Sequence, residues 1–175
     1  MSNSNAVLEA IKSRRSIRKF KPDAVSKELI DQIIEAGLYA PSGMGKQPVI
    51  FVTITNKEII GKLSAVNAEI MGTDTDPFYG APVAIVVLAN TERPTHVQDG
   101  SLAMENLMLS AHSLGLGSCW INRAKETFER DEWKQFLKDQ SIEGSYEGIA
   151  ICVVGYADVA PTAAARLDNR VFYVD

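Results

Sequence analysis

The stretch from Val97 to Leu114 constrains the fold of this chain more than any other part of the sequence. Its apolar side chains surround most of the circumference of a helix, whereas an ordinary surface helix carries one apolar stripe. In a chain of 175 residues, the simplest way to bury such a helix is to pack it against a copy of itself. The sequence therefore predicts an obligate homodimer. The apolar residues of the stretch are Leu102, Ala103, Met104, Leu107, Met108, Leu109, Ala111 and Leu114.

Capping residues and apolar spacing predict further helices on both sides of this stretch. Asn5, Ser26 and Asn56 each precede a helical pattern, and their side-chain oxygens can accept bonds from first-turn N–H groups. The helix after Ser26 should stop at Pro41, because proline disfavours helix at the preceding residue. One last helix is expected to carry Phe128, Trp133, Phe136 and Leu137.

Runs of β-branched and other apolar residues predict buried strands, the first of which should be central in the sheet. These runs lie at 49–54, 83–88, 119–121 and 149–154. Gly115 should end the long helix in a Schellman turn. Residues 71–80 should form a mobile loop. The apolar residues 171–174 are suited to pair as an edge strand, on this chain or on a partner subunit.

Composition predicts one domain spanning residues 1–175, because 46% of the residues are hydrophobic and can form a sizeable core. The net charge of −4 argues against nucleic acid as the partner. No apolar run approaches the roughly 20 residues that a membrane span requires. The polar start Met1–Asn5 leads directly into a helix, so no signal peptide is expected. Together these features predict a cytoplasmic protein.

Protein side chains are not expected to carry the chemistry themselves. His96 and His112 are the only two histidines, and no Cys, Asp or Glu set completes a metal site with them. His112 on the long helix should be a hydrogen-bonded core residue. Cys119 and Cys152 are too few for a disulfide framework, and Cys119 has no histidine nearby in sequence to activate it. We therefore predict neither a metal nor a catalytic acid, base or nucleophile.

The densest cationic segment runs from Lys12 to Lys21 and holds six of the 18 Lys and Arg residues. In it, Arg14, Arg15 and Arg18 flank Ser16, and forked donors beside a hydroxyl suit a phosphate. Cations are also favoured at the C-terminus of a helix, so a helix-end role is an equal alternative for the segment alone. A bound anion would relieve the repulsion among three arginines.

Two other segments have a local explanation and a functional one. Ala40–Gly43 followed by Gln47–Pro48 is an ordinary helix stop, but its small residues would also let the backbone approach a flat ring closely. Cys119–Asn122 places a large ring and a polar residue where a buried strand reaches the surface.

Placed in order, these segments resemble the nitroreductase family of FMN-dependent oxidoreductases. The matching segments are Arg14–Phe20, Ala40–Ser42, Gln47–Pro48, Ala81–Pro82, Gly115–Ile121 and Gly155–Tyr156. The resemblance implies an α+β fold in which helices flank a central mixed or antiparallel sheet, built as an intertwined homodimer. It also implies one FMN per subunit at the dimer interface, with NAD(P)H as the electron donor.

The same resemblance assigns the FMN contacts to segments of both chains. The phosphate, ribityl and pyrimidine end would be held by Arg14, Arg15, Ser16 and Arg18, and the phosphate also by Arg166. The isoalloxazine would lie against Pro41, Ser42 and Gly43 of the partner subunit. Its other side would be lined by Trp120, Ile121 and Asn122, with the Asn122 N–H near flavin N5.

The chain departs from the common family pattern at several positions. Gly45 and Val49 stand where Asn and Trp are frequent, and Ala164 stands where a phosphate-binding Lys is frequent. Asn67 is a candidate for the flavin ligand in the middle of the chain.

The activity implied is ping-pong hydride transfer from NAD(P)H, through FMN, to a small nitroaromatic, quinone or enone oxidant. Three alternatives remain. The first is flavin-fragmenting or reductively dehalogenating chemistry on the same fold. The second is a flavin-binding or redox-sensing module with little turnover, and the third is a plain anion-binding scaffold.

Overall fold

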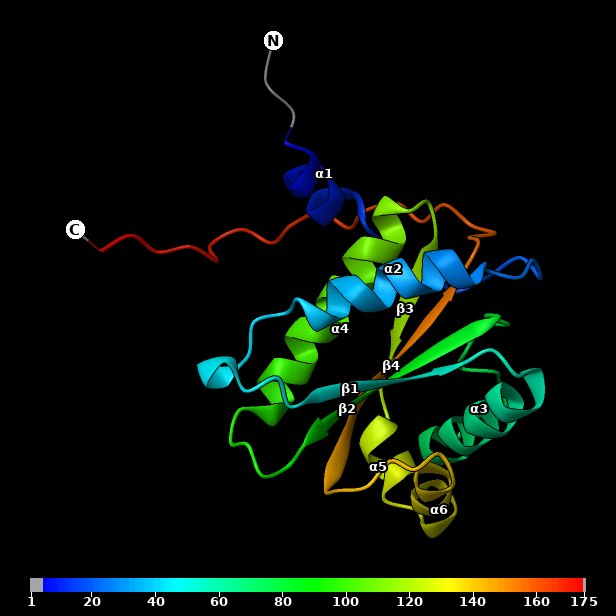
Figure 1. Ribbon diagram of the computed structural model, residues 1–175. Helices are drawn as coiled ribbons and strands as arrows, with labels where there is room; N and C mark the ends of the chain where they lie inside the picture. The colour runs from blue at the N-terminus through cyan, green and yellow to red at the C-terminus, as the bar shows by residue number, and fades with distance from the viewer. Residues whose placement is uncertain (1–4, 175) are drawn as a thin grey trace.

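The computed structural model describes residues 5–174, which form three layers with a β-sheet between two groups of helices (Figure 1). The sheet is antiparallel and four-stranded, in the order β1-β2-β4-β3. Its strands are β1 (Val49–Ile54), β2 (Val83–Asn90), β3 (Gly117–Ile121) and β4 (Tyr146–Gly155). The helices described are α1 (Ala6–Ser13), α2 (Lys27–Leu38), α3 (Lys57–Met71), α4 (His96–Ser113), α5 (Ala124–Phe128) and α6 (Asp131–Asp139), with a 3₁₀ turn η1 at Gly43–Gly45.

The predicted caps start the first three helices. The side chains of Asn5, Ser26 and Asn56 each accept a bond from an N–H group in the first turn of α1, α2 and α3. The long helix α4 ends as predicted, because Gly115 has a φ of 77° and the Leu116 N–H donates to the Ala111 carbonyl at 2.8 Å. Local capping chemistry therefore explains the starts of α1, α2 and α3 and the end of α4.

Strands β2 and β4 occupy the centre of the sheet, and β1 lies at its edge. The prediction that β1 is central was wrong. Most of its side chains are only half-buried, whereas residues 84–89 of β2 are fully buried. A β-branched run indicates a strand, but the order of strands depends on pairings between distant parts of the chain.

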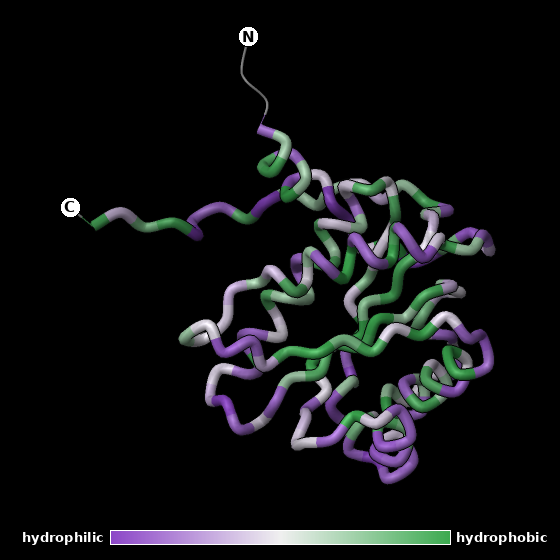
Figure 2. The backbone as a smooth tube through the Cα atoms, viewed as in Figure 1, coloured by the Kyte–Doolittle hydropathy of each residue, from purple (hydrophilic) through white to green (hydrophobic). Residues whose placement is uncertain are grey.

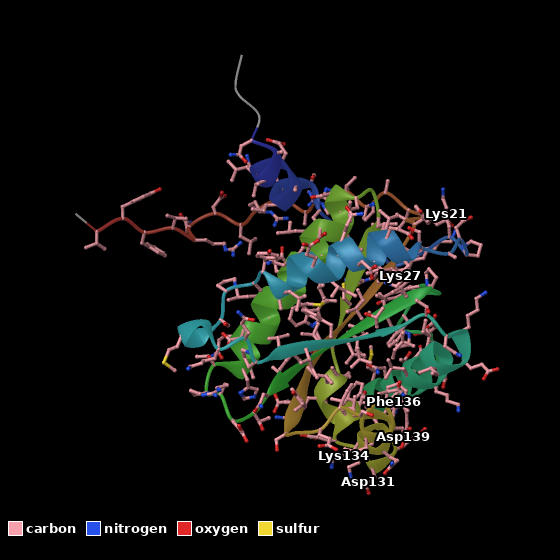
Figure 3. The ribbon with its side chains drawn as sticks, in the orientation of Figure 1. Lys21, Lys27, Asp131, Lys134, Phe136 and Asp139 are labelled. Carbon is pink, nitrogen blue, oxygen red and sulfur yellow. The ribbon has the colours of Figure 1, made fainter. Side chains whose placement is uncertain are left out.

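Apolar side chains fill both spaces between the sheet and the helices. Helices α2 and α4 cover one face, where Ile33, Met104 and Leu107 are completely buried. Helices α3, α5 and α6 cover the other face around Leu63 and Trp133. Figure 2 shows the strands as hydrophobic tracks through the middle of the molecule, and Figure 3 places the labelled charged residues of α6 on the outside.

The last predicted helix is divided in two. Helix α5 ends at Phe128 and α6 begins at Asp131, with Arg130 extended between them. The break lets the aromatic rings pack edge to face: Trp133 lies 5.7 Å from Phe128 and 5.3 Å from Phe136, between ring centroids. One helical pattern in the sequence could not reveal this break.

The stretch 71–80, expected as a mobile loop, is anchored at its second half. Phe78 is 1% exposed and belongs to the core beneath α3. The Asp76 carboxylate accepts bonds from the Phe78 and Gly80 N–H groups and from the Ser64 hydroxyl.

Part of the apolar surface predicted for a dimer remains open in the single chain. On α4, Leu102 is 46% exposed, and on α1 Val7, Leu8 and Ile11 are at least half exposed. The chain beyond residue 157 runs past α1 and away from the body (Figure 1). Residues 171–174 are exposed and form no strand within this chain, so only their pairing on a partner remains as a prediction. Residues 1–4, used above to argue against a signal peptide, lie outside the described residues.

Candidate functional site

The arginine segment runs in extended form beside β3, immediately after α1. The Ile17 N–H donates to the Ser118 carbonyl at 2.9 Å, and Ser16 forms a parallel bridge with Ser118. Ile17 and Phe20 point into the core, so the intervening residues are held at its surface. The sheet edge thus fixes the backbone from which the arginines project.

Arg14 and Arg15 have different environments. The Arg14 side chain is only 22% exposed, and its Nε and Nη1 are buried without a hydrogen-bond partner within residues 5–174. Its nearest carboxylate, from Glu105, lies 3.7 Å from Nε. Arg15 instead donates from Nη1 to the carbonyl oxygens of Lys12 and Arg14. The helix-end alternative therefore describes Arg15, whereas Arg14 has unused donors that suit an anion.

Ser16 and Arg18 lie beside the same buried strand as Arg14. Burial raises the pKa of the Cys119 thiol, and Arg18, Ser16 and Arg14 offset part of that rise. The thiol thus has all three groups as neighbours, and it stays protonated near neutral pH. The Ser118 hydroxyl is buried without a partner in the same region.

The remaining cations of the segment are directed elsewhere. Lys19 forms an ion pair with Asp158 at 2.7 Å. Lys21 is exposed, and Figure 3 shows it near the start of α2, away from α1. The candidate anion site therefore includes fewer cations than the charge pattern suggests, and it is centred on Arg14.

The Trp120–Asn122 segment reaches the surface at the end of β3. Trp120 is half-buried, Ile121 is in the core and Asn122 is exposed. Arg123 follows in the left-handed conformation, with φ 79°, and opens α5. The side chain of Ile121 therefore packs inward, and this residue contributes only its backbone to the surface.

The 41–47 loop is tied to the N-terminal turn of α4. The Gly43 N–H donates to Asp99 Oδ1 at 3.0 Å, and the Thr95 hydroxyl donates to Asp99 Oδ2 at 2.9 Å. A Cβ on Gly43 would collide with the Thr95 hydroxyl, so a close approach requires glycine there. Asp99 is 4% exposed and was missed in the sequence. The available signal was an acidic residue in the first turn of the helix.

Replacing Asp99 with Ala should free this loop. The change leaves the Gly43 N–H without its acceptor, and hydrogen bonds to charged groups contribute about 2 kcal/mol each. We expect a lower melting temperature and faster proteolysis between Pro41 and Gln47. Asp99→Asn is the matched control, because its oxygen can accept from Gly43 while its amide donates to Thr95. Equal rates of proteolysis in wild type and Asp99→Ala would show that Asp99 does not restrain the 41–47 loop.

The 41–47 loop and the arginine segment lie at opposite ends of α4 (Figure 1). Asp99 contacts Gly43 near the start of the helix, and His112 bonds Ser13 at 2.7 Å near its end. At about 1.5 Å per residue, Asp99 and His112 are roughly 20 Å apart. His112 is half-buried between two helices and is hydrogen-bonded as expected, although it lies outside the core.

Two other candidate residues are placed differently. Arg166 is exposed in the extended tail, where its guanidinium bonds only the Ala164 carbonyl among the described residues. Asn67 is completely buried, and its amide donates to Leu63 and Thr127. Complete burial and these two hydrogen bonds place the Asn67 side chain inside the core between α3 and α5, so its candidate role as a flavin contact gains no support from the structure.

The fold and this site define an α+β protein with a buried, unsatisfied guanidinium at a sheet edge. Within residues 5–174, no group of three or more His, Cys, Asp or Glu side chains could hold a metal ion. None of the helices in that range combines the length and apolar character needed to cross a membrane. The structure thus describes a class of α+β protein in which buried arginine donors, of a kind that suits an anionic group, lie beside the end of an antiparallel sheet.

Comparison with known proteins narrows this class to one family. The family model described as the nitroreductase family matches residues 11–76 and 71–156. A Methanothermobacter thermautotrophicus protein, provisionally named NADH dehydrogenase/NAD(P)H nitroreductase, is 41% identical over 123 residues, which cover 65% of this chain and 59% of that relative. An Archaeoglobus fulgidus protein of the same name is 33% identical over 137 residues, covering 75% of this chain and 74% of its own.

A solved structure agrees over nearly the whole chain. The Bacteroides fragilis nitroreductase with bound FMN superposes with a TM-score of 0.89 at 26% identity, covering 98% of this chain and 100% of that one. The chain belongs to the nitroreductase family. The resemblance seen in the sequence and the α+β fold class that it implied are therefore confirmed.

Proposed function

We propose that this protein is an FMN-dependent oxidoreductase that takes electrons from NAD(P)H. The observation that carries the proposal is Arg14, whose guanidinium has two buried nitrogen atoms without a hydrogen-bond partner in the described part of the chain. Buried donors of this kind are costly unless an acceptor reaches them, and a phosphate supplies several charged oxygens. The FMN bound to the B. fragilis nitroreductase is a ligand of the matching chemistry.

The phosphate end of FMN is assigned to the arginine segment. Arg14 supplies the buried forked donor, and Ser16 with Arg18 extends the site along β3. The partnerless Ser118 hydroxyl beneath them adds a polar group. Arg15 acts by holding the end of α1, since its guanidinium is bonded to carbonyl oxygens there. Arg166, in the exposed tail, is assigned to the phosphate only in the dimer.

The ring of FMN is assigned to the end of β3. Bound FMN would supply the hydride acceptor and donor at N5 of its ring. Trp120 and the backbone of Ile121 would form one wall, and the Asn122 N–H would face N5. Burial raises the pKa of both thiols, Cys152 most strongly, so neither one acts as a nucleophile at neutral pH. The protein therefore binds and orients, while protons come from solvent.

A homodimer completes the site in this proposal. Within one chain the 41–47 loop lies roughly 20 Å along α4 from the arginine end. A two-fold axis that sets two α4 helices against each other in opposite directions brings the loop of each chain to the arginine end of the other. Pro41, Ser42 and Gly43 of the partner subunit would then lie on the ring, and each dimer would hold two FMN molecules.

The oxidants in this proposal are small, flat electron acceptors such as nitroaromatics, quinones and enones. The enzyme would reduce them in a ping-pong cycle, after NAD(P)H has reduced the enzyme and left. In each subunit, residues 1–175 would form one domain. We assign the protein to the cytoplasm, where a reducing environment suits two free thiols.

The proposal is tested with purified protein and added FMN. We expect stoichiometric binding, seen as flavin absorbance that stays with the protein through gel filtration, and rapid anaerobic bleaching by NADH or NADPH. Tight FMN binding without bleaching by either nucleotide would identify a binding module instead. Protein that takes up no FMN would refute the proposal.

A further inference from the structure

A buried polar pair connects α3 to α5 within an otherwise apolar part of the core. Asn67 and Thr127 are both 0% exposed, and the Asn67 amide donates to Thr127 Oγ1 at 3.2 Å and to the Leu63 carbonyl at 3.0 Å. The Asn67 Oδ1 atom has no partner among the described residues. A buried amide with an unused acceptor is less stable than an apolar side chain of the same shape. Core packing alone therefore does not explain the pair.

Thr127 of this pair also bonds the turn between β3 and α5. The Thr127 hydroxyl donates to the Arg123 carbonyl at 2.7 Å, and the Thr127 N–H donates to the same oxygen at 3.0 Å. Arg123 has φ 79° and ψ 10°, a left-handed conformation that disfavours residues with a Cβ. Such a conformation persists only where the surroundings hold it. Here the Arg123 carbonyl oxygen accepts two hydrogen bonds from Thr127, and these bonds hold the left-handed conformation.

Strand β4 restrains the same turn from the opposite side. A Cβ on Gly148 would lie 2.5 Å from the Ala124 carbonyl carbon, so the backbone of the turn rests directly on the strand. Before the turn, Ile121 is paired in register with Ile151. The exposed Asn122 thus lies between a paired strand residue and a turn that is held on two sides.

We propose that Asn67 and Thr127 are positioning residues that fix the direction of the Asn122 N–H. This inference rests on the proposed function, in which that N–H faces flavin N5. A backbone donor has no rotamers, so only the local backbone can aim it, and hydrogen bonds weaken steeply when their angle falls below about 120°. The contacts of Asn67 with Thr127 and of Thr127 with Arg123 fix the local backbone, and hence the direction of the Asn122 N–H, from buried positions that FMN would not contact.

The first experiment uses the flavin-free protein and amide hydrogen exchange. Thr127→Val keeps the shape of the side chain and removes the hydroxyl, so exchange of the Thr127 amide and its neighbours in 122–128 should quicken about five-fold. Thr127→Ser should restore the wild-type rate. Ser64→Ala is the matched control, because Ser64 is also buried on α3 but bonds Asp76 instead of the turn. Asn67→Leu, a second variant that keeps the volume, should quicken exchange in the same segment.

The second experiment uses the FMN-loaded protein. Single-turnover bleaching by NADH or NADPH should be about ten-fold slower in Thr127→Val, while FMN is retained, and Thr127→Ser should recover the rate. Unchanged exchange in Thr127→Val and Asn67→Leu would overturn the positioning role. Faster exchange with an unchanged bleaching rate would overturn the link to N5. Wild-type protein that binds no FMN would instead overturn the proposed function, while the exchange data would still decide whether the pair holds the turn.

Discussion

Arg14→Ala should abolish retention of FMN, whereas Arg15→Ala should leave FMN bound. Arg14 has two buried nitrogen atoms without a hydrogen-bond partner among the described residues, and each charge-assisted bond to a phosphate contributes about 1.5–3 kcal/mol. The dissociation constant for FMN should therefore rise at least about a hundred-fold in Arg14→Ala. Fluorescence titration of flavin-free protein with FMN measures this change.

Arg15→Ala is a matched control because it removes an equal charge from the neighbouring position. Its guanidinium is bonded to carbonyl oxygens of α1, so its loss should lower stability by about 1 kcal/mol or less. FMN affinity should change only a few-fold. Equal loss of FMN in the two variants would mean that overall charge, instead of the buried position of Arg14, determines binding.

Leu102→Asp should convert the proposed dimer to a monomer and remove FMN at the same time. Leu102 is 46% exposed on α4, the helix that we expect to pack against its copy. Burying a leucine contributes about 1.5–3 kcal/mol to the free energy of association, and in a two-fold dimer the substitution occurs once in each subunit. The dimer dissociation constant should therefore rise about a hundred-fold or more. Sedimentation of the 19.1 kDa chain at several concentrations measures the change.

The loss of FMN in Leu102→Asp follows from the geometry of α4. In a monomer, the 41–47 loop cannot reach the arginine end of its own chain, so the ring loses one wall. Met71→Asp is the control, because Met71 is 50% exposed at the end of α3, on the other face of the sheet. Both variants place a new charge on an exposed apolar residue. A Leu102→Asp protein that stays dimeric would refute the α4 interface.

Much of the site could be predicted because its signals are local. The segment containing Arg14 and Ser16 was identified from charge and spacing, and Trp120–Asn122 from a strand that ends in a polar residue. Sequence order also placed Pro41–Gly43 in a loop after α2, and the structure has the loop there.

The errors have a common physical cause. The sequence could offer Asn67 only as a candidate for the flavin ligand in the middle of the chain, because it did not show that packing of α3 on α5 buries Asn67 and uses its amide on Thr127. Asp99 was overlooked because its partner, Gly43, is distant in the chain. Contacts of this kind form only when separate elements meet.

The sequence by itself determined the caps of the first three helices, the positions of the four strands, and the short motifs whose order indicates the family. These properties depend on residues within a few positions of one another, where backbone geometry and side-chain chemistry act directly. Only the tertiary structure decided that β1 is an edge strand, that Arg14 and not Arg15 has free buried donors, and that the two halves of the site lie at opposite ends of α4. Those outcomes depend on which distant surfaces bury each other, and burial decides which polar groups keep a free hydrogen-bonding position.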